Sequence, residues 1–265
     1  MGELIDARTL ASSDKIKEKF KEVLGNEHKY FMQSVVNSIS NNPSLLKCDG
    51  KSVWSAAMNS AVLGLPIDNN LSYAAIVPFK GKAQFQIMIR GYIQLAIDTG
   101  LYKNIHVTEV YDDELDYHDP LRNKTHFTDK ALWKQRYGND STKIVGFFAF
   151  LELNNGFYKE MYMSKEEVEA HGKQYSQTFT NPRGLWQTNF HAMAKKTVLK
   201  NLIRQYGILG RRDTQKLARA LDLDQGFIDE FGSDEIKYYD NPNASESDDI
   251  EIEVEEDFKD SPLEG

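Results

Sequence analysis

Three cations spaced four residues apart in the segment 187–206 are the residues of this chain best suited to binding an anionic ligand. At 3.6 residues per turn, Lys196, Lys200 and Arg204 lie within a stripe about 80° wide, with one positive charge about every 6 Å along the axis. Phosphates in an extended nucleic-acid strand have a similar spacing. The row therefore predicts a phosphate-binding face, and an ordinary solvated helix face is the alternative.

The segment around this row is strongly basic. Residues 171–219 contain a single acidic residue, Asp213, and no carboxylate lies between residues 170 and 212 to pair with the cations. This imbalance favours a polyanionic partner. Lys195 falls among the apolar positions of the helix, so it either extends outward or points into a groove. The ten cations of the segment are Lys173, Arg183, Lys195, Lys196, Lys200, Arg204, Arg211, Arg212, Lys216 and Arg219.

Aromatic residues alternate with this charge, and base stacking on such rings contributes about 1–3 kcal/mol per base. Helical spacing favours core packing for Phe190 and Tyr206, whereas Trp186 beside Arg183-Gly184 is open to either role. A second, weaker set lies in Phe79-Lys80-Gly81-Lys82 and Ile89-Arg90-Gly91-Tyr92, where glycine lets a backbone approach a ligand closely. The other aromatic residues of the basic segment are Tyr175 and Phe179.

An acidic stretch provides the best case for an enzyme. Clustered carboxylates suit hard cations, and two-metal nucleases use them. These acids form one contiguous polar loop, however, which favours a solvated loop over a magnesium site or a hydrolytic centre. The stretch contains Glu109, Asp112, Asp113, Glu114, Asp116 and Asp119, with His106, His118 and His126 nearby.

Other catalytic and redox motifs are missing from the sequence. It has no G-x-x-x-x-G-K-[ST] motif for ATP phosphates and no G-x-S-x-G nucleophile motif. The single cysteine, Cys48, allows no internal disulfide and no thiolate cluster for zinc. We therefore expect no cofactor and no catalysis, with Mg²⁺ binding possible but required by no motif.

The net charge of −8 is unevenly distributed along the 265 residues. Residues 229–265 carry 15 acids and 2 lysines, a net of −13, so residues 1–228 carry a net of +5. The acids alternate with apolar residues from Asp248 to Phe258, a pattern suited to binding a partner protein or folding onto a basic groove as a DNA mimic. A plain solubilising tail is the alternative. No apolar run is long enough to span a bilayer, and we expect a cytosolic protein.

The hydrophobic periodicity of the sequence predicts helices and strands that together form an α+β fold and position these residues. Residues 14–40 read as one or two helices that break at Gly25-Asn26, and a helix capped by Ser52 runs to about residue 63. Strands at 73–79 and 83–89 flank a hairpin turn, a helix spans 92–97, and a strand follows at 105–111. Strands at 144–153 and 157–163 flank Asn155-Gly156, the strongest hairpin signal.

The strands are expected to form an antiparallel meander of about five, with residues 112–142 polar and irregular. The spacing of Ser164 and Glu167 predicts a capping box that starts a short helix to about residue 170. One uninterrupted, basic amphipathic helix of about 30 Å is expected over 187–206. Beyond Gly232 the composition predicts a disordered tail.

Two segments resemble the RecT family of phage and prophage single-strand annealing proteins. One is QIMIRGYIQLA at 86–96, followed by Thr99-Gly100, and the other is WQTNFHAMAKKTVLKNL at 186–202. Gly64-Leu65-Pro66, followed by residues 73–79, also looks like an early part of the family's core. The resemblance covers roughly residues 30–220 and is weakest over 111–142.

The resemblance implies an α+β core whose strands and long helix line a positively charged groove. It also implies a protein that oligomerises as a ring or filament and pairs complementary DNA strands in the bacterial host cytosol. A phage 5′→3′ exonuclease and the host single-strand-binding protein are the implied partners. Position by position, Arg90, Lys195, Lys196 and Lys200 match the family's basic positions.

The sequence thus predicts an ATP-independent protein that binds single-stranded DNA, anneals it and holds the nascent duplex. A passive single-strand coat and a Mg²⁺-dependent nuclease are the alternatives. Residues 1–30 are expected to be a helical segment for subunit contacts, 31–228 the annealing core, and 229–265 the partner-binding tail. The predicted DNA-binding residues are Lys80, Lys82, Arg90, Tyr92, Lys103, Arg183, Trp186, Lys195, Lys196, Lys200, Arg204, Arg211 and Arg212.

Overall fold

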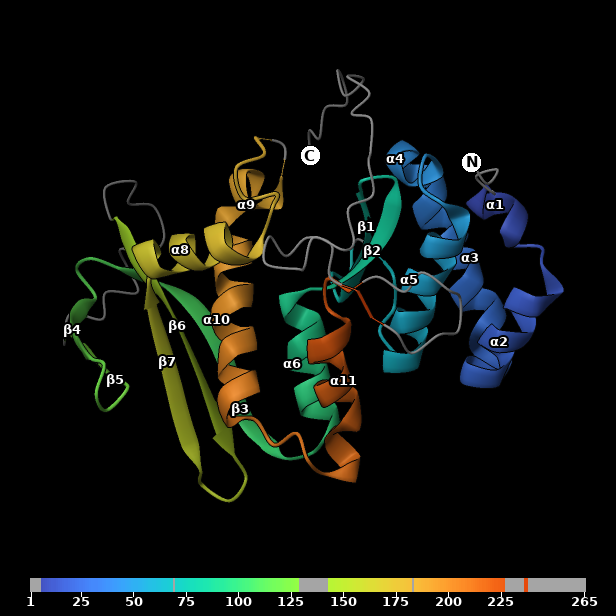
Figure 1. The fold of residues 1–265 in the computed structure, drawn as a ribbon. Helices are drawn as coiled ribbons and strands as arrows, with labels where there is room; N and C mark the ends of the chain where they lie inside the picture. Colours follow the sequence, from blue (N-terminus) through green and yellow to red (C-terminus); the bar gives the residue numbers. More distant parts are fainter. Residues whose placement is uncertain (1–5, 69, 129–142, 183, 227–235, 238–265) are drawn as a thin grey trace.

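The computed structural model describes residues 6–68, 70–128, 143–182, 184–226 and 236–237. Helices form one end of the molecule and an antiparallel sheet forms the other, with more helices between them (Figure 1). One continuous hydrophobic cluster extends from Ala7 near the N-terminus to Leu223. The structure is thus α+β, as the sequence predicts. None of the described helices has the length and apolar character needed to cross a membrane.

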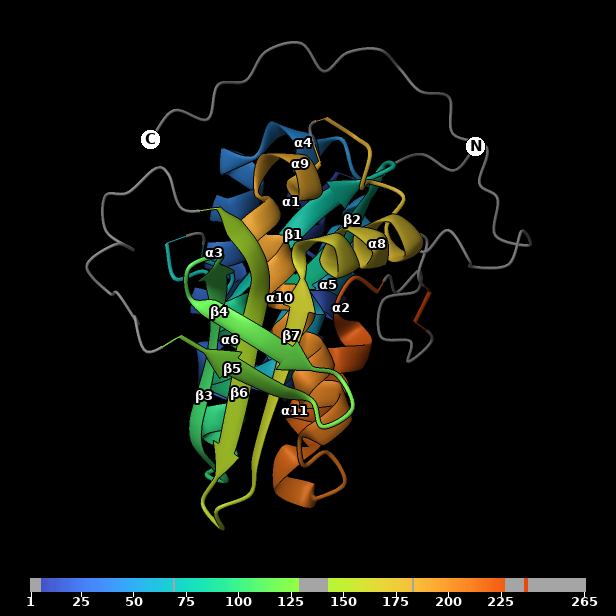
Figure 2. The ribbon, with the colours of Figure 1, turned by 90° about the vertical axis from the view of Figure 1, so that its left-hand side faces the viewer.

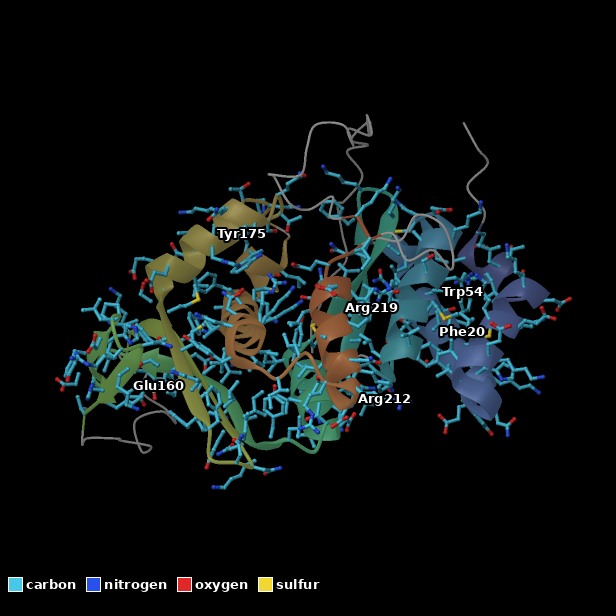
Figure 3. The ribbon with its side chains drawn as sticks, turned by 60° about the horizontal axis from the view of Figure 1, so that its bottom comes forward. Phe20, Trp54, Glu160, Tyr175, Arg212 and Arg219 are labelled. Atoms are coloured by element: carbon cyan, nitrogen blue, oxygen red, sulfur yellow. The ribbon has the colours of Figure 1, made fainter. Side chains whose placement is uncertain are left out.

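The helical end is built from the first third of the chain. Its helices are α1 (Ala7–Leu10), α2 (Asp14–Leu24), α3 (His28–Asn41), α4 (Pro43–Leu46) and α5 (Gly50–Leu63). α1 and α2 pack on α5, and α3 packs on α2 and α4. A 3-10 turn over Gly25–Glu27 separates α2 from α3, which confirms the predicted break. Phe20 and Trp54 pack edge to face with ring centroids 5.6 Å apart, and both are fully buried (Figure 3).

The start of α5 corrects the predicted cap. The Asp49 side chain accepts hydrogen bonds from the backbone N–H groups of Lys51 and Ser52, so Asp49 is the N-cap. The Ser52 hydroxyl donates to the carbonyl of Asp49 and accepts from the N–H of Ala83 at 2.8 Å. Ser52 therefore joins α5 to the neighbouring hairpin. Gly64, with φ of +72°, ends the helix as expected.

The strands form three sheets among the described residues, so the prediction of a single meander is wrong. β1 (Ala74–Phe79) and β2 (Lys82–Ile87) form the predicted hairpin, with positive φ at Lys80 and Gly81. β3 (Tyr102–Tyr111), β6 (Ile144–Leu153) and β7 (Tyr158–Ser164) form the main sheet in the order β3-β6-β7. The hairpin of β6 and β7 confirms the Asn155-Gly156 signal.

A third hairpin lies where the sequence predicts irregular structure. β4 (Leu115–Asp119) and β5 (Lys124–Phe127) pair with each other and lie across the main sheet (Figure 2). A two-stranded hairpin is marginal by itself. This one is held by buried Glu160 of β7, which accepts the N–H of Thr125 at 2.6 Å and pairs with Lys124 at 2.8 Å. Glu160 is labelled in Figure 3.

The remaining helices cover the sheet and carry the basic segment. They are α6 (Ile89–Asp98), α8 (Lys165–Tyr175), α9 (Leu185–Thr188), α10 (Phe190–Tyr206) and α11 (Gln215–Leu223). The capping box of Ser164 and Glu167 is confirmed, although α8 continues five residues beyond the predicted end. The predicted uninterrupted helix is broken at Asn189, whose φ and ψ are −144° and 52°. α10 stands between the main sheet and the pair α6 and α11 (Figure 1).

The sequence suggested that Gly91 lets the backbone approach a ligand closely. In the structure Gly91 instead allows close packing within the protein. It lies in the first turn of α6 and is buried against the chain before β1. A Cβ at this position would collide with the carbonyl oxygen of Tyr73 and would lie 2.8 Å from Cγ2 of Ile87. The close approach at Gly91 is therefore made by the protein's own backbone.

Replacing Gly91 with alanine is expected to lower the free energy of unfolding by about 1–3 kcal/mol, because the backbone must shift to accept the methyl group. Urea unfolding measures the loss. Gly210→Ala is the control, since no heavy atom lies within 4 Å of its added Cβ. Equal stability of the two variants would contradict the packing role of Gly91.

Candidate nucleic-acid interface

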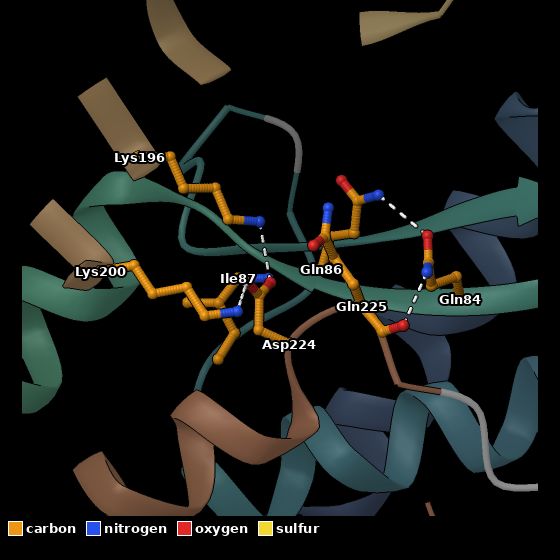
Figure 4. Close-up of polar contacts among 7 residues, drawn as sticks. All are labelled: Gln84, Gln86, Ile87, Lys196, Lys200, Asp224 and Gln225. Carbon is orange, nitrogen blue, oxygen red and sulfur yellow. Dashed lines mark hydrogen bonds and ion pairs between the residues drawn. The ribbon is translucent and has the colours of Figure 1, made fainter. Parts of the chain in front are cut away.

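The central feature of the basic segment is a buried carboxylate between two lysines. Asp224 lies at the C-terminal end of α11, and its side chain is fully buried. Its Oδ1 lies 2.8 Å from Nζ of Lys196 and its Oδ2 lies 2.9 Å from Nζ of Lys200. The N–H of Ile87 donates to the same carboxylate at 2.9 Å (Figure 4). The carboxylate thus joins α10, α11 and the end of β2.

This arrangement keeps Asp224 ionised. Burial acts to raise the pKa of the carboxyl group, but the attraction and hydrogen bonds of Lys196 and Lys200 outweigh burial and hold the pKa well below its usual range. Burial also lowers the pKa of Lys196, against the opposing effect of Asp224. The three charges form one unit in which two cations share one anion, leaving a net positive charge.

The buried triad changes the interpretation of the predicted cationic row. Lys196 is only 5% exposed, so the prediction that it faces outward is wrong. Lys200 has a side chain 17% exposed, and Arg204, one turn further along α10, is exposed. The helix is covered by the sheet on one side and by α6 and α11 on the other, which buries part of the cationic stripe. The row therefore runs from the interior to the surface.

A cleft of about 640 Å³ opens where this row reaches the surface. α8, α10, the end of α11 and the start of α9 contribute its walls. The lining combines cations, aromatic rings and apolar side chains: His171, Gly172, Tyr175, Ser176, Trp186, Met193, Lys196, Thr197, Lys200, Asn201, Arg204, Leu221, Asp224 and Gln225. A cleft of this size and lining can hold part of an anionic, ring-bearing ligand.

Two aromatic residues of α8 and α9 have different roles in the cleft. Trp186 is 5% exposed and packs on Phe179, with ring centroids 5.4 Å apart. Its Nε1–H has no acceptor among the described residues. Tyr175 is 47% exposed and lies 4.6 Å from the ring of His171 (Figure 3). Tyr175 is therefore the ring that a base can reach, and Trp186 contributes an unused hydrogen-bond donor.

His171 lies in the cleft near Lys200 and Arg204. Burial lowers the pKa of its imidazole, and the nearby charges of Lys200 and Arg204 lower it further. Both effects disfavour the charged imidazolium form. Positive potential focused between low-dielectric walls attracts phosphate groups.

Comparisons with known proteins identify the family of this chain. The family model described as RecT family matches residues 29–226, which is more than half of the chain. The chain belongs to the RecT family. It is 40% identical over 200 residues to the uncharacterized protein YqaK of Bacillus subtilis (strain 168), covering 76% of this chain and 66% of YqaK.

A second relative is more distant. Protein RecT of Escherichia coli (strain K12) is 26% identical over 192 residues, covering 69% of this chain and 66% of that protein. The RecT-family chain therefore spans slightly less than two thirds of the length of each of these relatives. The helix α10 and the cleft both lie inside the matched region.

The cleft gathers only some of the residues predicted for the RecT-family interface. Trp186, Lys196, Lys200 and Arg204 line it, and Lys196 and Trp186 do so as buried residues. Lys80 lies close by, because its Nζ donates to Oε1 of Gln177 in the chain that follows α8, at 2.8 Å. The sequence named Tyr175 without assigning it a role and missed His171, Asn201, Asp224 and Gln225.

Other predicted contacts lie outside the cleft. Lys195 pairs with Glu109 of β3 at 2.7 Å, on the sheet side of α10. Lys103 pairs with Glu152 at 2.7 Å across the main sheet. Tyr92 is fully buried in α6, so we withdraw it from the interface. Arg183 lies outside the described residues.

The remaining predicted cations lie on the surface of the described chain. Lys82 is partly buried at the start of β2, and the guanidinium of Arg90 lies over the ring of Tyr73 at 5.3 Å. Arg211 pairs with Asp213 at 3.0 Å, whereas Arg212 is exposed before α11 (Figure 3). Whether any of these residues contacts DNA stays a prediction.

The acidic stretch shows no metal site in the part of the chain that the structure describes. No group of three or more His, Cys, Asp or Glu side chains there is placed to hold a metal ion. Asp119 pairs with Arg122 at 2.7 Å inside the β4–β5 turn. Glu114 accepts the N–H of Tyr111 at 3.1 Å. Asp119 and Glu114 thus each bind a group three residues away and stabilise local turns.

Proposed function

We propose that this chain binds single-stranded DNA and anneals complementary strands without ATP. The observation that carries the proposal is the cleft on α10, where two cations share one buried carboxylate and Arg204 extends to the surface. Membership of the RecT family supports the same function. Pairing of bases makes and breaks no covalent bond, so the chain needs binding groups only.

The cleft suits a single strand because it offers cations for the phosphates and an aromatic ring for a base. The guanidinium of Arg204 and the partly exposed ammonium of Lys200 can contact phosphate oxygens. The exposed ring of Tyr175 can stack on a base of any sequence. Binding of this kind leaves the edges of the other bases free to pair.

The modest charge of the fold favours binding by many subunits together. A net of +5 on residues 1–228 provides few phosphate contacts per subunit. Affinity for one short strand is then low, and it rises when neighbouring copies bind along the same strand. We therefore propose that the chain assembles into a ring or helical filament. Its family membership leads us to propose a phage exonuclease and a host single-strand-binding protein as partners.

The favoured ligand is then the pair of strands as it forms on the protein. Preformed duplex has a persistence length of about 150 base pairs, so fitting it to a site shaped for an extended strand costs energy. Strands that arrive one after the other avoid this cost and bring a second set of phosphates. Long complementary strands added in sequence are expected to give the most salt-resistant complex.

Labelled complementary oligonucleotides test this function directly. Faster duplex formation with intact strands, with EDTA present, is the expected result. Slower duplex formation would support the passive coat, and Mg²⁺-dependent shortening of strands would support the nuclease. If preformed duplex resists salt as well as sequentially added strands do, the preference for the nascent pair is wrong.

A further inference from the structure

The chain leaves the described fold at the edge of the cleft. Asp224 and Gln225 both line it. The N–H of Gln225 donates to the carbonyl of Phe85 at 2.9 Å. Figure 4 shows the second bond, in which Nε2 of Gln84 donates to the carbonyl of Gln225 at 2.7 Å. These bonds fix the last residues after α11 to β2. The acidic tail is thereby attached beside the cations of α10.

Ile236 fixes a second point of the chain in the same region. It packs on the hydrophobic core, and a Cβ on Gly226 would lie 2.5 Å from its Cγ2. Ten residues separate Lys237 from Asp248, and this length spans up to about 36 Å when extended. The acidic segment 248–257 can therefore reach every part of the cleft.

The cleft already accepts a carboxylate from this end of the chain. Asp224 sits between Lys196 and Lys200 in the geometry that a phosphate would use, with each ammonium on a different oxygen. Arg204 is exposed beyond them, and the buried side chains of Met193 and Leu221 line the cleft beside the charges. This lining suits a peptide in which acids alternate with apolar residues.

The tail has that composition. Residues 248–257 contain seven acids around Ile250, Ile252 and Val254, and residues 229–265 carry a net charge of −13. A tethered segment reaches an effective concentration in the millimolar range, so weak contacts are enough to occupy the cleft. The opposite charges of tail and cleft strengthen those contacts at low salt.

We propose that the acidic segment 248–257 binds in the cleft of its own chain and competes there with a DNA strand. In this proposal its carboxylates pair with Arg204 and Lys200, and its apolar residues contact Met193 and Leu221. The tail then excludes short or isolated strands, and a strand bound by many subunits displaces it. Only the competition step rests on the proposed function, because occupancy of the cleft can be measured without DNA.

The rate at which an engineered disulfide forms between the tail and the cleft measures how often the tail occupies the cleft. The only native cysteine, Cys48, is buried, and burial together with Asp49 raises the pKa of its thiol to about 11, so it reacts slowly. In the full chain carrying Tyr175→Cys and Ile252→Cys, mild oxidation is expected to give an intramolecular disulfide. The control pair is Tyr30→Cys with Ile252→Cys, since Tyr30 is 84% exposed on α3.

The expected result is that the Tyr175 pair forms the disulfide at least fivefold faster than the Tyr30 pair, and that 1 M salt removes the difference. Equal rates for the two pairs would overturn the proposal. Disulfide-linked dimers as the main product would also overturn it, because the tail would then bind another copy.

A double-mutant cycle tests the competition. Neutralising the seven acids of 248–257 to Asn or Gln in the full chain is expected to raise affinity for single-stranded DNA about fivefold or more at low salt. The gain should shrink in an Arg204→Gln background and persist in an Arg122→Gln background, since the side chain of Arg122 is 80% exposed in the β4–β5 turn. Equal gains in both would show repulsion by overall charge and contradict competition at the cleft.

These measurements separate the two proposals. A wild-type chain that fails to anneal strands while the Tyr175 pair forms its disulfide would refute the proposed function alone. A chain that anneals strands while the two pairs react equally would refute the tail contact alone.

Discussion

Replacing Asp224 with asparagine is expected to lower the free energy of unfolding by about 3–5 kcal/mol, because two lysines lose their shared counter-charge in a buried site. For a domain of this size, each 1 kcal/mol corresponds to about 2–4 °C in melting temperature. The midpoint should therefore fall by about 10 °C. Thermal and urea unfolding measure the change.

Asp116→Asn is the matched control, since Asp116 is exposed on β4 and the same change there should stay within about 0.5 kcal/mol. Similar losses in the two variants would show that Asp224 does not hold the lysines. A chain with Lys196→Met, Lys200→Met and Asp224→Leu should regain much of the stability, because a well-packed apolar cluster can replace a buried charge network.

The same variant gives a pH signature. The pKa of Asp224 is lower in the folded chain than its usual value of about 3.9 in the unfolded chain. Its contribution to stability is therefore complete above about pH 5 and is lost as the pH falls through the folded value. The stability difference between wild type and Asp224→Asn should stay constant above pH 5 and narrow below about pH 4.

The sequence predicted the elements that depend on local signals. The break at Gly25-Asn26, the turn at Asn155-Gly156 and the capping box at Ser164 each arise from residues within one turn of one another. The structure confirms them for that reason. The β4–β5 hairpin was missed because Glu160, which holds it, lies 36 residues after Lys124. The anchor is a tertiary contact without a local pattern.

In the candidate site, too, the sequence predicted what depends on local spacing and missed what depends on tertiary contacts. The spacing of Lys196, Lys200 and Arg204 was enough to place all three along one line of α10. It could not show which of them the fold buries, because that depends on α11 and on Asp224, 28 residues after Lys196. A carboxylate that is absent from the neighbouring sequence thus reaches Lys196 and Lys200 through the fold. Glu109, 86 residues before Lys195, is a second such partner.

Contacts of Arg204 and Tyr175 with DNA should be separable by their salt dependence. Arg204→Gln is expected to weaken binding of single-stranded DNA and to reduce the slope of log affinity against log salt by about 0.7 per subunit, because one phosphate contact is lost. Tyr175→Leu is expected to cost about 1–3 kcal/mol per stacked base with the slope unchanged, since the ring carries no charge.

The matched controls lie on the β4–β5 hairpin, away from the cleft. Arg122→Gln removes an arginine whose side chain is 80% exposed in the β4–β5 turn, and Tyr117→Leu removes a ring of β4 that is 51% exposed. Both controls should bind as wild type does at every salt concentration. Binding to a poly-dT strand, measured from 50 to 300 mM salt, distinguishes the four variants, and unchanged melting temperatures exclude unfolding as the cause.

The pattern of the two effects decides where the strand lies. A lower slope for Arg204→Gln together with a parallel loss for Tyr175→Leu would place a phosphate and a base on opposite walls of the same cleft. If Arg204→Gln keeps the wild-type slope in a folded chain, the exposed end of the row is only a solvated face. Equal losses in Arg122→Gln would instead mean that cations over the whole surface attract the strand, and the cleft would have no special role.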